Sequence, residues 1–368
     1  MRNRGVYIVE DEVLDASGTR IFNLDFSNPL LALIVTVEGK KFDMSDTRNP
    51  IIAREISKIE IVDGSDVLFS INMEEAMALQ LYSSGKQPFM SYSNNSTSGR
   101  CRATVKIAFG RDDSDQEWML DCKKFVNPQL KITYAFTEGA GFWTDNYQKL
   151  TVHAVVCENP AREAMGFLMG KQIYTWAKAT SGDETIDMPR DYLYRLMMIR
   201  VKDSDTPTYA EISKIKLSCD IDRFVPVNIT TQDLFFENAV RYGILSQQME
   251  TIGDGADIDI KAHCPFANNW GANVECWNSG DVAVIKRPYS GYSTIGRTSA
   301  VALTANQRAI VTHLGYEYNW CEPYPFGNLR DVEEFFDPIS FKAVRLILTQ
   351  AQTDACDSGV VLQQLRPY

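Results

Sequence analysis

The chain has 368 residues, of which 45% are hydrophobic and 23% are charged, so it can fold into two domains and is too apolar for a disordered protein. Its 48 acidic residues outnumber its 37 basic residues, and the net charge is -11. This negative charge disfavours a surface devoted to nucleic-acid phosphates, so we expect no direct sequence-specific contact with nucleic acid.

The N-terminal residues from Met1 to Tyr7 include two arginines but no apolar run long enough for a signal peptide or a membrane span. We therefore expect the chain to stay soluble where it is made. The eight cysteines are scattered and form no C-x-x-C pair. That spacing is typical of reduced thiols in the cytosol rather than of a disulfide framework.

The first half of the chain begins with an apolar, β-branched run at 30–37 that predicts a strand, followed by a Ser-Asp-Thr loop at 45–47. The pentapeptide Glu-Ile-Ser-Lys-Ile at 55–59 begins a second predicted strand. Asn72 predicts the N-cap of a helix that ends near Gly85. An Asx-Pro turn then leads to a strand at 130–136, which we expect to close this half.

The same order of elements returns in the second half, where the pentapeptide recurs unchanged at 211–215. A strand-like run at 192–201 and a Ser-Asp-Thr loop at 204–206 precede it. A helix capped by Asn228 and closed by Gly243 follows, and a second Asx-Pro turn leads to a closing strand at 341–348. Short strands alone are weak evidence of relationship, but this ordered correspondence indicates duplication of one domain.

Most remaining segments are short apolar runs between Gly, Pro, Asn, Asp and Ser clusters, which predict antiparallel β structure. We therefore expect an all-β fold with two tandem eight-stranded jelly-roll sandwiches and short inserted helices. The first sandwich is expected at 1–160, with an N-terminal extension at 1–18, and the second at 186–368. Residues 161–185 are the expected linker.

This organisation resembles the double jelly-roll major capsid proteins of tailless icosahedral double-stranded DNA viruses, including membrane-containing bacteriophages. The resemblance spans nearly the whole chain and rests on the two pentapeptide strands, the strands before them, the capped helices and the closing strands. It implies a structural, non-enzymatic protein of the virion that forms homotrimeric, pseudo-hexameric capsomers. The implied partners are neighbouring capsomers, minor capsid or penton proteins and, in some virions, an internal membrane, with assembly in the host cytoplasm.

The two copies differ most at about 244–307, where the second contains a long aromatic-rich insertion. A structureless segment of this length would be unusual in a compact domain, and exposing its aromatic side chains together would be costly. We therefore expect the insertion to pack at an outer or intersubunit surface, with five candidate interface residues: Phe266, Trp270, Trp277, Tyr289 and Tyr292. By the resemblance, such insertions form towers on the outer face of the capsomer.

The sequence predicts neither a cofactor site nor a metal site. None of the three histidines belongs to an H-E-x-x-H pattern. His263, Cys264 and Cys276 could supply three zinc ligands, but they lack C-x-x-C spacing, so a loop with buried cysteines is the simpler expectation.

Acidic clusters likewise predict no catalytic or calcium site. Asp254, Asp257 and Asp259 depart from the EF-hand order and lack its distal glutamate, which favours a solvated turn. Glu74 and Glu75, as well as the acids at 112, 113 and 115, are expected to face water. No nucleophile elbow, P-loop or dinucleotide fingerprint occurs.

Two alternative functions stay open, since fold does not fix function. A two-sandwich carbohydrate-active enzyme would be expected to have an acidic pair in a tryptophan-lined cleft and usually a secretion signal. The chain has six tryptophans but no such signal. A glycan-binding virion or surface module would instead use the loops of the insertion.

Overall fold

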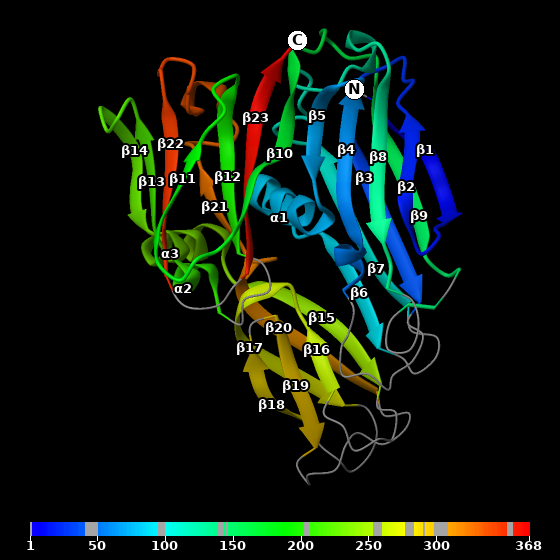
Figure 1. Ribbon diagram of the computed structural model, residues 1–368. Coiled ribbons are helices and arrows are strands. Elements are labelled where there is room, and N and C mark those ends of the chain that lie inside the picture. The colour runs from blue at the N-terminus through cyan, green and yellow to red at the C-terminus, as the bar shows by residue number, and fades with distance from the viewer. Residues whose placement is uncertain are drawn as a thin grey trace.

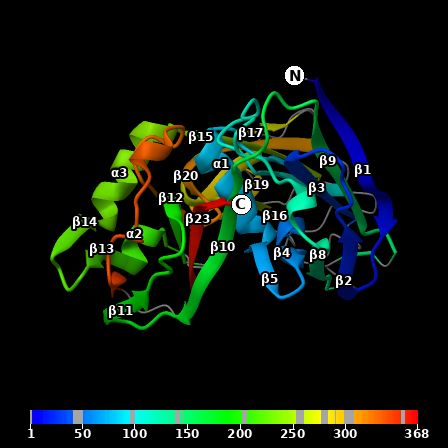
Figure 2. The ribbon, with the colours of Figure 1, turned by 90° about the horizontal axis from the view of Figure 1, so that it is seen from above.

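The computed structural model describes residues 2–40, 51–94, 100–137, 143–144, 146–201, 206–252, 260–276, 283–289, 291–297, 308–351 and 356–368. Two β-sandwich lobes stand side by side, with helix α1 (Met73–Ser84) between them (Figures 1 and 2). Both termini lie at one end of the molecule, and the strands of the insertion extend from the other (Figure 1).

The first lobe consists of nine strands and two short 3-10 helices before and after α1. They are β1 (Arg2–Val13), β2 (Ser17–Asn23), β3 (Leu30–Lys40), η1 (Ile52–Glu55), β4 (Ile56–Asp63), β5 (Asp66–Ile71), β6 (Phe89–Asn94), β7 (Arg100–Ala108), η2 (Cys122–Lys124), β8 (Pro128–Ala135) and β9 (Lys149–Glu158).

The second lobe follows with eight strands, two α-helices and one 3-10 helix. They are β10 (Gly166–Ala177), β11 (Gly182–Asp187), β12 (Leu193–Val201), α2 (Thr208–Glu211), β13 (Ile212–Cys219), β14 (Phe224–Thr230), α3 (Thr231–Tyr242), β21 (Cys321–Pro325), η3 (Val332–Glu334), β22 (Val344–Gln350) and β23 (Asp357–Pro367). The insertion between α3 and β21 contains β15 (Leu245–Ile252), β16 (Ile260–His263), β17 (Phe266–Cys276), β18 (Ala283–Tyr289), β19 (Tyr292–Arg297) and β20 (Arg308–Tyr318).

The strand order confirms that one domain is duplicated. In the first lobe, four strands run β1-β9-β3-β7 and four run β2-β8-β4-β5. The second lobe repeats both orders as β10-β23-β12-β21 and β11-β22-β13-β14, and α3 follows β14 as α1 follows β5. Each lobe therefore contains the eight strands of the expected sandwich, with β6 as an additional strand beside β7 in the first lobe, and the all-β prediction is confirmed.

The repeated pentapeptide occupies equivalent strands, β4 and β13, as predicted. Its two isoleucines are three residues apart, so a regular strand would direct them to opposite faces. Ile56 and Ile59 are nevertheless both buried, because β4 slips in register against β8 between Ile56 and Lys58. The same slip occurs in β13 against β22, between Ile212 and Lys214. This geometry, a β-bulge that both lobes share, turns both apolar side chains into the core.

The predictions for the closing strands and for the cap of α3 need correction. The strands after the Asx-Pro turns are β8 and β22, but they do not close their halves, because β9 and β23 follow and complete the opposite sheets. The cap of α3 is Thr230, whose side chain accepts a hydrogen bond from the Asp233 N–H, because Asn228 still belongs to β14. The Asn72 cap of α1 is confirmed.

The segment expected as a linker contains β10 and most of β11, which occupy the places of β1 and β2 in the second lobe. We propose on this basis that the second lobe begins at about residue 166 rather than at 186. The change matters because β10 is also the strand that joins the lobes: it pairs with β5 of the first lobe and with β23 of the second.

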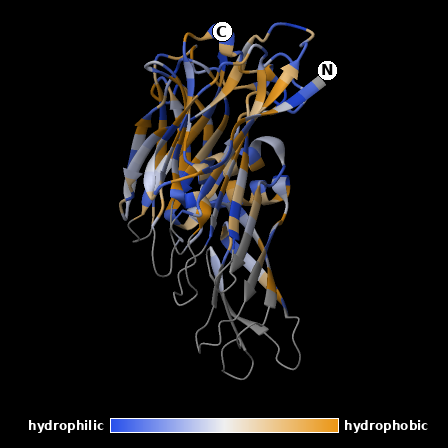
Figure 3. Cartoon of the chain, turned by 90° about the vertical axis from the view of Figure 1, so that its right-hand side faces the viewer, coloured by the Kyte–Doolittle hydropathy of each residue, from blue (hydrophilic) through white to orange (hydrophobic). Residues whose placement is uncertain are grey.

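The insertion continues a sheet of the first lobe, because β15 pairs in parallel with β6. The strands β15, β20 and β17 lie next to one another, and β16, β19 and β18 form a separate small sheet. Apolar segments are concentrated along the strands of the lobes (Figure 3). One core cluster joins the first lobe, α1 and the base of the insertion, and another fills the second lobe. Within the described residues, no helix is long and apolar enough to span a membrane.

Candidate assembly surfaces and buried charge clusters

The first turn of α1 carries a buried acidic pair at the boundary between the lobes. Glu74 and Glu75 are only 3% and 0% exposed, so the prediction that they face water was wrong. Arg200 of β12 forms an ion pair with Glu74 and places its Nη1 atom 3.5 Å from Oε1 of Glu75. Arg54 contributes a further ion pair to Glu74 at 2.9 Å. A buried carboxylate is tolerated only with such partners, so these contacts connect the two lobes.

Hydrogen bonds further define the position of Glu75. Its carboxylate accepts hydrogen bonds from the backbone N–H of Asn72 at 3.2 Å and from Gln172 Nε2 at 2.8 Å. Burial raises the pKa of Glu75, and the positive charge of Arg200 opposes that increase. The same side chain thus completes the helix cap and links α1 to β10 of the second lobe.

The acids at 112, 113 and 115 divide into two groups. Asp112 and Asp113 are exposed, as expected, and Asp113 forms ion pairs with Lys86 and Lys106. Asp115 is buried instead, because its carboxylate accepts two hydrogen bonds from the Arg111 guanidinium. Burial alone would raise the pKa of Asp115, but the hydrogen bonds from Arg111 hold it below its usual value.

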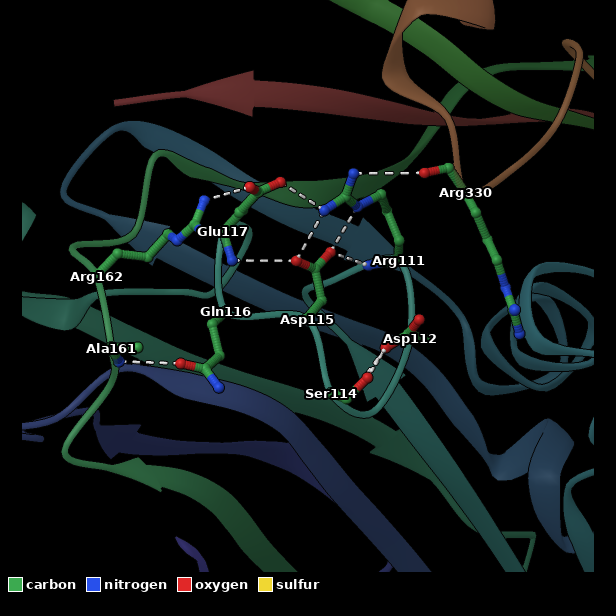
Figure 4. Close-up of a pocket in the computed structure, with 9 residues that line it drawn as sticks. All are labelled: Arg111, Asp112, Ser114, Asp115, Gln116, Glu117, Ala161, Arg162 and Arg330. Atoms are coloured by element: carbon green, nitrogen blue, oxygen red, sulfur yellow. Dashed lines mark hydrogen bonds and ion pairs between the residues drawn. The ribbon is translucent and has the colours of Figure 1, made fainter. Parts of the chain in front are cut away.

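A charged pocket of about 500 Å³ surrounds this pair (Figure 4). Glu117 lies between Arg111 and Arg162 and forms ion pairs with both. Arg330 of the second lobe accepts a hydrogen bond from Arg111 through its carbonyl oxygen at 3.3 Å, while its side chain extends away from the acids. Asp115 and Glu117 are thus paired with arginines, and Arg111 connects a loop of the first lobe to one of the second.

A second buried acidic pair, which sequence reasoning missed, lies where β20 leads into β21. Glu317 accepts hydrogen bonds from the Thr208 N–H at 3.0 and 3.2 Å, and Glu322 accepts one from Asn238 Nδ2. Both carboxyls line a cavity of about 20 Å³. Burial raises the pKa of Glu317 to about 7, and burial together with the charge of Glu317 raises that of Glu322. The sequence feature that could have indicated this burial is the run between the two acids, which contains two aromatic residues and a cysteine.

The predicted interface residues of the insertion have different environments. Phe266 is fully buried and packs against Tyr318, with ring centroids 6.2 Å apart. Trp270 is 72% exposed, and Tyr292 is half-buried beside the His263 ring. Trp277 and the side chain of Tyr289 lie outside the described residues. Phe266 therefore belongs to the core, and Trp270 is the candidate that reaches the surface.

Further exposed apolar side chains, which sequence reasoning did not identify, lie on α3 and on the elements beside it, and Trp270 is connected to this helix through a chain of rings. Its ring centroid is 6.1 Å from that of Tyr316, which in turn contacts Phe235 of α3. The α3 aromatic surface, as we call it, consists of the exposed side chains Phe236, Val240, Ile244, Trp270 and Leu314. Phe236 and Val240 are four residues apart and share one face of the helix. Exposed apolar side chains on neighbouring elements make this region a candidate interaction surface.

The candidate metal ligands do not assemble into a site among the described residues. Cys264 is buried, and burial raises the pKa of its thiol to about 12. His263 is half-buried, and the side chain of Cys276 lies outside the described residues. Asp254, Asp257 and Asp259 also lie outside them. No group of three His, Cys, Asp or Glu residues in the described part of the chain could hold a metal ion.

No protein-family model and no curated protein matches the chain. Solved structures do match over its full length. The major capsid protein of Sulfolobus turreted icosahedral virus matches with a TM-score of 0.60 and 10% identity, covering 99% of this chain and 96% of that one. The major capsid protein P2 of bacteriophage PM2 has a TM-score of 0.52 and 10% identity, with coverage of 99% and 98%.

The capsid of the virus PBCV-1 gives a TM-score of 0.56 at 8% identity, with 99% of this chain and 93% of that chain covered. At such low identity the likeness concerns the fold. The match extends across both lobes and agrees with the duplicated strand order. The chain therefore has the double jelly-roll fold of these viral major capsid proteins.

Proposed function

We propose that the chain is a structural major capsid protein whose homotrimers form the pseudo-hexameric capsomers of an icosahedral virion. The observation that carries the proposal is the duplication of one sandwich, combined with the full-length likeness to viral capsid proteins. Three copies of a chain with two similar lobes present six lobes around one axis. Such a trimer requires contacts between unlike faces of neighbouring chains, which close into a ring.

The interlobe contacts support this role, because a capsomer needs both lobes in a fixed relative orientation. The Arg200 ion pairs join β12 to α1, and β10 pairs with strands of both lobes. The α3 aromatic surface is the proposed contact between subunits, with Trp270 as its anchor from the insertion. In this proposal the half-buried Tyr292 and the buried Phe266 support the contact from inside the protein.

The further partners proposed are neighbouring capsomers and minor capsid or penton proteins, with an internal membrane in virions that have one. Assembly in the host cytoplasm of a bacteriophage-like virus and the lack of enzymatic activity belong to the same proposal. The lack of enzymatic activity is supported by the arginine partners of Asp115 and Glu117 in the charged pocket, because a glycosidase needs carboxyl groups free to transfer a proton.

Native mass spectrometry and electron microscopy of the purified full chain test the proposal. We expect trimers in solution and hexagonal particles in projection. A chain that stays monomeric at high protein concentration, in several salt conditions, would contradict the capsomer model. Turnover of an oligosaccharide by the purified chain would favour the carbohydrate-active alternative.

A further inference from the structure

The sheet that crosses the lobe boundary has an opening where β5 ends. Ile71, the last residue of β5, pairs with Ile59, so Ser57 and Lys58 of β4 extend past it. On the other side, β10 pairs with β5 at Lys171 and continues to Ala177. Among the described residues, no strand lies between β4 and β10 beyond this point.

One cavity occupies this opening and a second adjoins it over β10 and β23, and together we name them the interlobe slot. One, of about 430 Å³, lies between Lys58 and Tyr174. The other, of about 480 Å³, follows β10 and β23 as far as Asp357. They share Asn72, Gln172 and Thr175 as lining residues. Both volumes fall within the range of ligand pockets, which is roughly 300–1,000 Å³.

The slot has a buried polar lining with unused hydrogen-bonding capacity. Arg200 and Ser358 both line it, and each is only 4% exposed. The Nε atom of Arg200 and the hydroxyl of Ser358 have no hydrogen-bond partner among the described residues. Buried polar atoms are nearly always partnered, so each such exception requires a physical explanation. A ligand that supplies the missing hydrogen-bond partners would provide such an explanation.

We propose that the interlobe slot binds an extended polypeptide segment of a partner protein, which enters as an added strand between β4 and β10. Strand edges present backbone N–H and C=O groups, and an extended peptide satisfies them by β-augmentation. A strand advances by about 3.3 Å per residue, so the six residues of β10 beyond Lys171 match a segment of about six residues. The proposal is independent of the capsid role.

The charges of the slot define the chemistry of the segment. Lys58 is paired with Glu60 at 2.8 Å, and Arg200 is paired with the acids of α1. Asp357 is an exposed lining carboxylate for which the described residues show no ion pair. The complementary segment is therefore uncharged along most of its length and carries one basic residue at the Asp357 end. An excess of negative charge on the chain also favours association of a basic peptide.

Hydrogen exchange of the full chain with a defined probe tests the proposal. The probe is a blocked hexapeptide of alternating threonine and valine that ends in lysine, and a proline-substituted peptide is the control. Slower exchange is expected at 56–58 and at 172–177 together, because an added strand contacts both edges. Exchange in β2, an edge strand distant in the sheet order, should not change.

Two variants add a second readout. Ser358→Ala should weaken binding by about five-fold without lowering the unfolding temperature, because the removed hydroxyl has no partner in the free protein. Thr175→Trp should abolish binding by filling the slot, whereas Thr185→Trp, at an exposed position of β11, should have no effect. All variants are compared by thermal unfolding.

The absence of protection at millimolar peptide, or protection of one edge alone, would overturn the proposal. Cellohexaose serves as a second probe. If the protein binds this oligosaccharide without amide protection and does not bind the peptides, the slot is a glycan groove. That outcome would also overturn the proposal.

Discussion

Arg200 of the second lobe lies across the lobe boundary from Glu75, with 3.5 Å between Nη1 and Oε1, and both side chains are buried. The two residues are far apart in sequence but meet because α1 lies between the lobes (Figure 1). The contact connects α1 to β12 of the second lobe and so helps to hold the two lobes in one relative orientation. It is also costly to disturb, because an unpaired charge would remain inside the protein.

Replacing Arg200 with alanine should therefore destabilise the chain by about 3–5 kcal/mol, since Glu75 loses its cationic partner. Chemical denaturation measures the loss. The exposed ion pair between Arg4 and Glu158 provides the matched control, because Arg4→Ala should cost less than about 1 kcal/mol. Equal effects of the two substitutions would show that the buried network does not hold the lobes together.

The bulge shared by β4 and β13 predicts a contrast within the pentapeptide. Ile215 is fully buried, whereas its neighbour Lys214 is exposed. Ile215→Ala should lower the free energy of unfolding by about 2–5 kcal/mol through the cavity that it leaves, and Lys214→Ala should have little effect. Ile59→Ala in the first lobe should behave like Ile215→Ala, because its strand and bulge are equivalent. A small effect of either isoleucine substitution would contradict the equivalence.

The repeat was predictable from sequence because duplication preserves residues that the core requires. The two pentapeptides and the Asn72 cap identified equivalent elements, and the strand order confirms them. The terminal strands β9 and β23 were not identified as such, because no repeated letters or turn motif marked them. Their role depends on the sheets that they complete, which is a property of the assembled fold.

The charged clusters could not be predicted for a related reason. Neighbouring acids such as Glu74 and Glu75 look like a solvated helix start, and only the distant Arg200 makes their burial possible. Of the aromatic candidates, Phe266 and Trp270 are four residues apart, yet one is in the core and the other on the surface. A register slip in β17 between Asn269 and Gly271 lies at Trp270, and local sequence gave no sign of it.

The α3 aromatic surface predicts where subunits meet. Combining Val240→Lys with Trp270→Ser should convert the proposed trimer to monomers, because it removes apolar area and adds charge to the contact. Both residues are exposed, so the unfolding temperature should remain close to that of the parent chain. Val126→Lys alters an even more exposed side chain in the loop before β8 and should leave the trimer intact. Sedimentation velocity distinguishes the species, and trimers of the double variant would exclude this surface as the contact.

The buried carboxyls Glu317 and Glu322 predict a loss of stability as pH rises. The pKa of Glu317 is raised by burial from 4.5 to about 7, and that of Glu322 is raised in the same direction. Between these pH values the folded state binds more protons than the unfolded state. Protonation of the two carboxyls therefore stabilises the folded state fully below about pH 4.5, and this contribution is lost as the pH rises through 7. The loss should be on the order of 3 kcal/mol.

Glu322→Gln tests this relation, because the amide keeps an oxygen that can accept the hydrogen bond from Asn238 and removes the charge. The variant should be more stable than the parent chain at pH 8, and its stability should depend less on pH between 5 and 7. Glu333→Gln, at an exposed position of η3, is the control and should reproduce the parent profile. Urea denaturation at a series of pH values gives both curves. If the parent chain gains stability from pH 5 to 8, the two carboxyls are ionised in the folded protein, and the connection between β20 and β21 must contain a compensating positive charge.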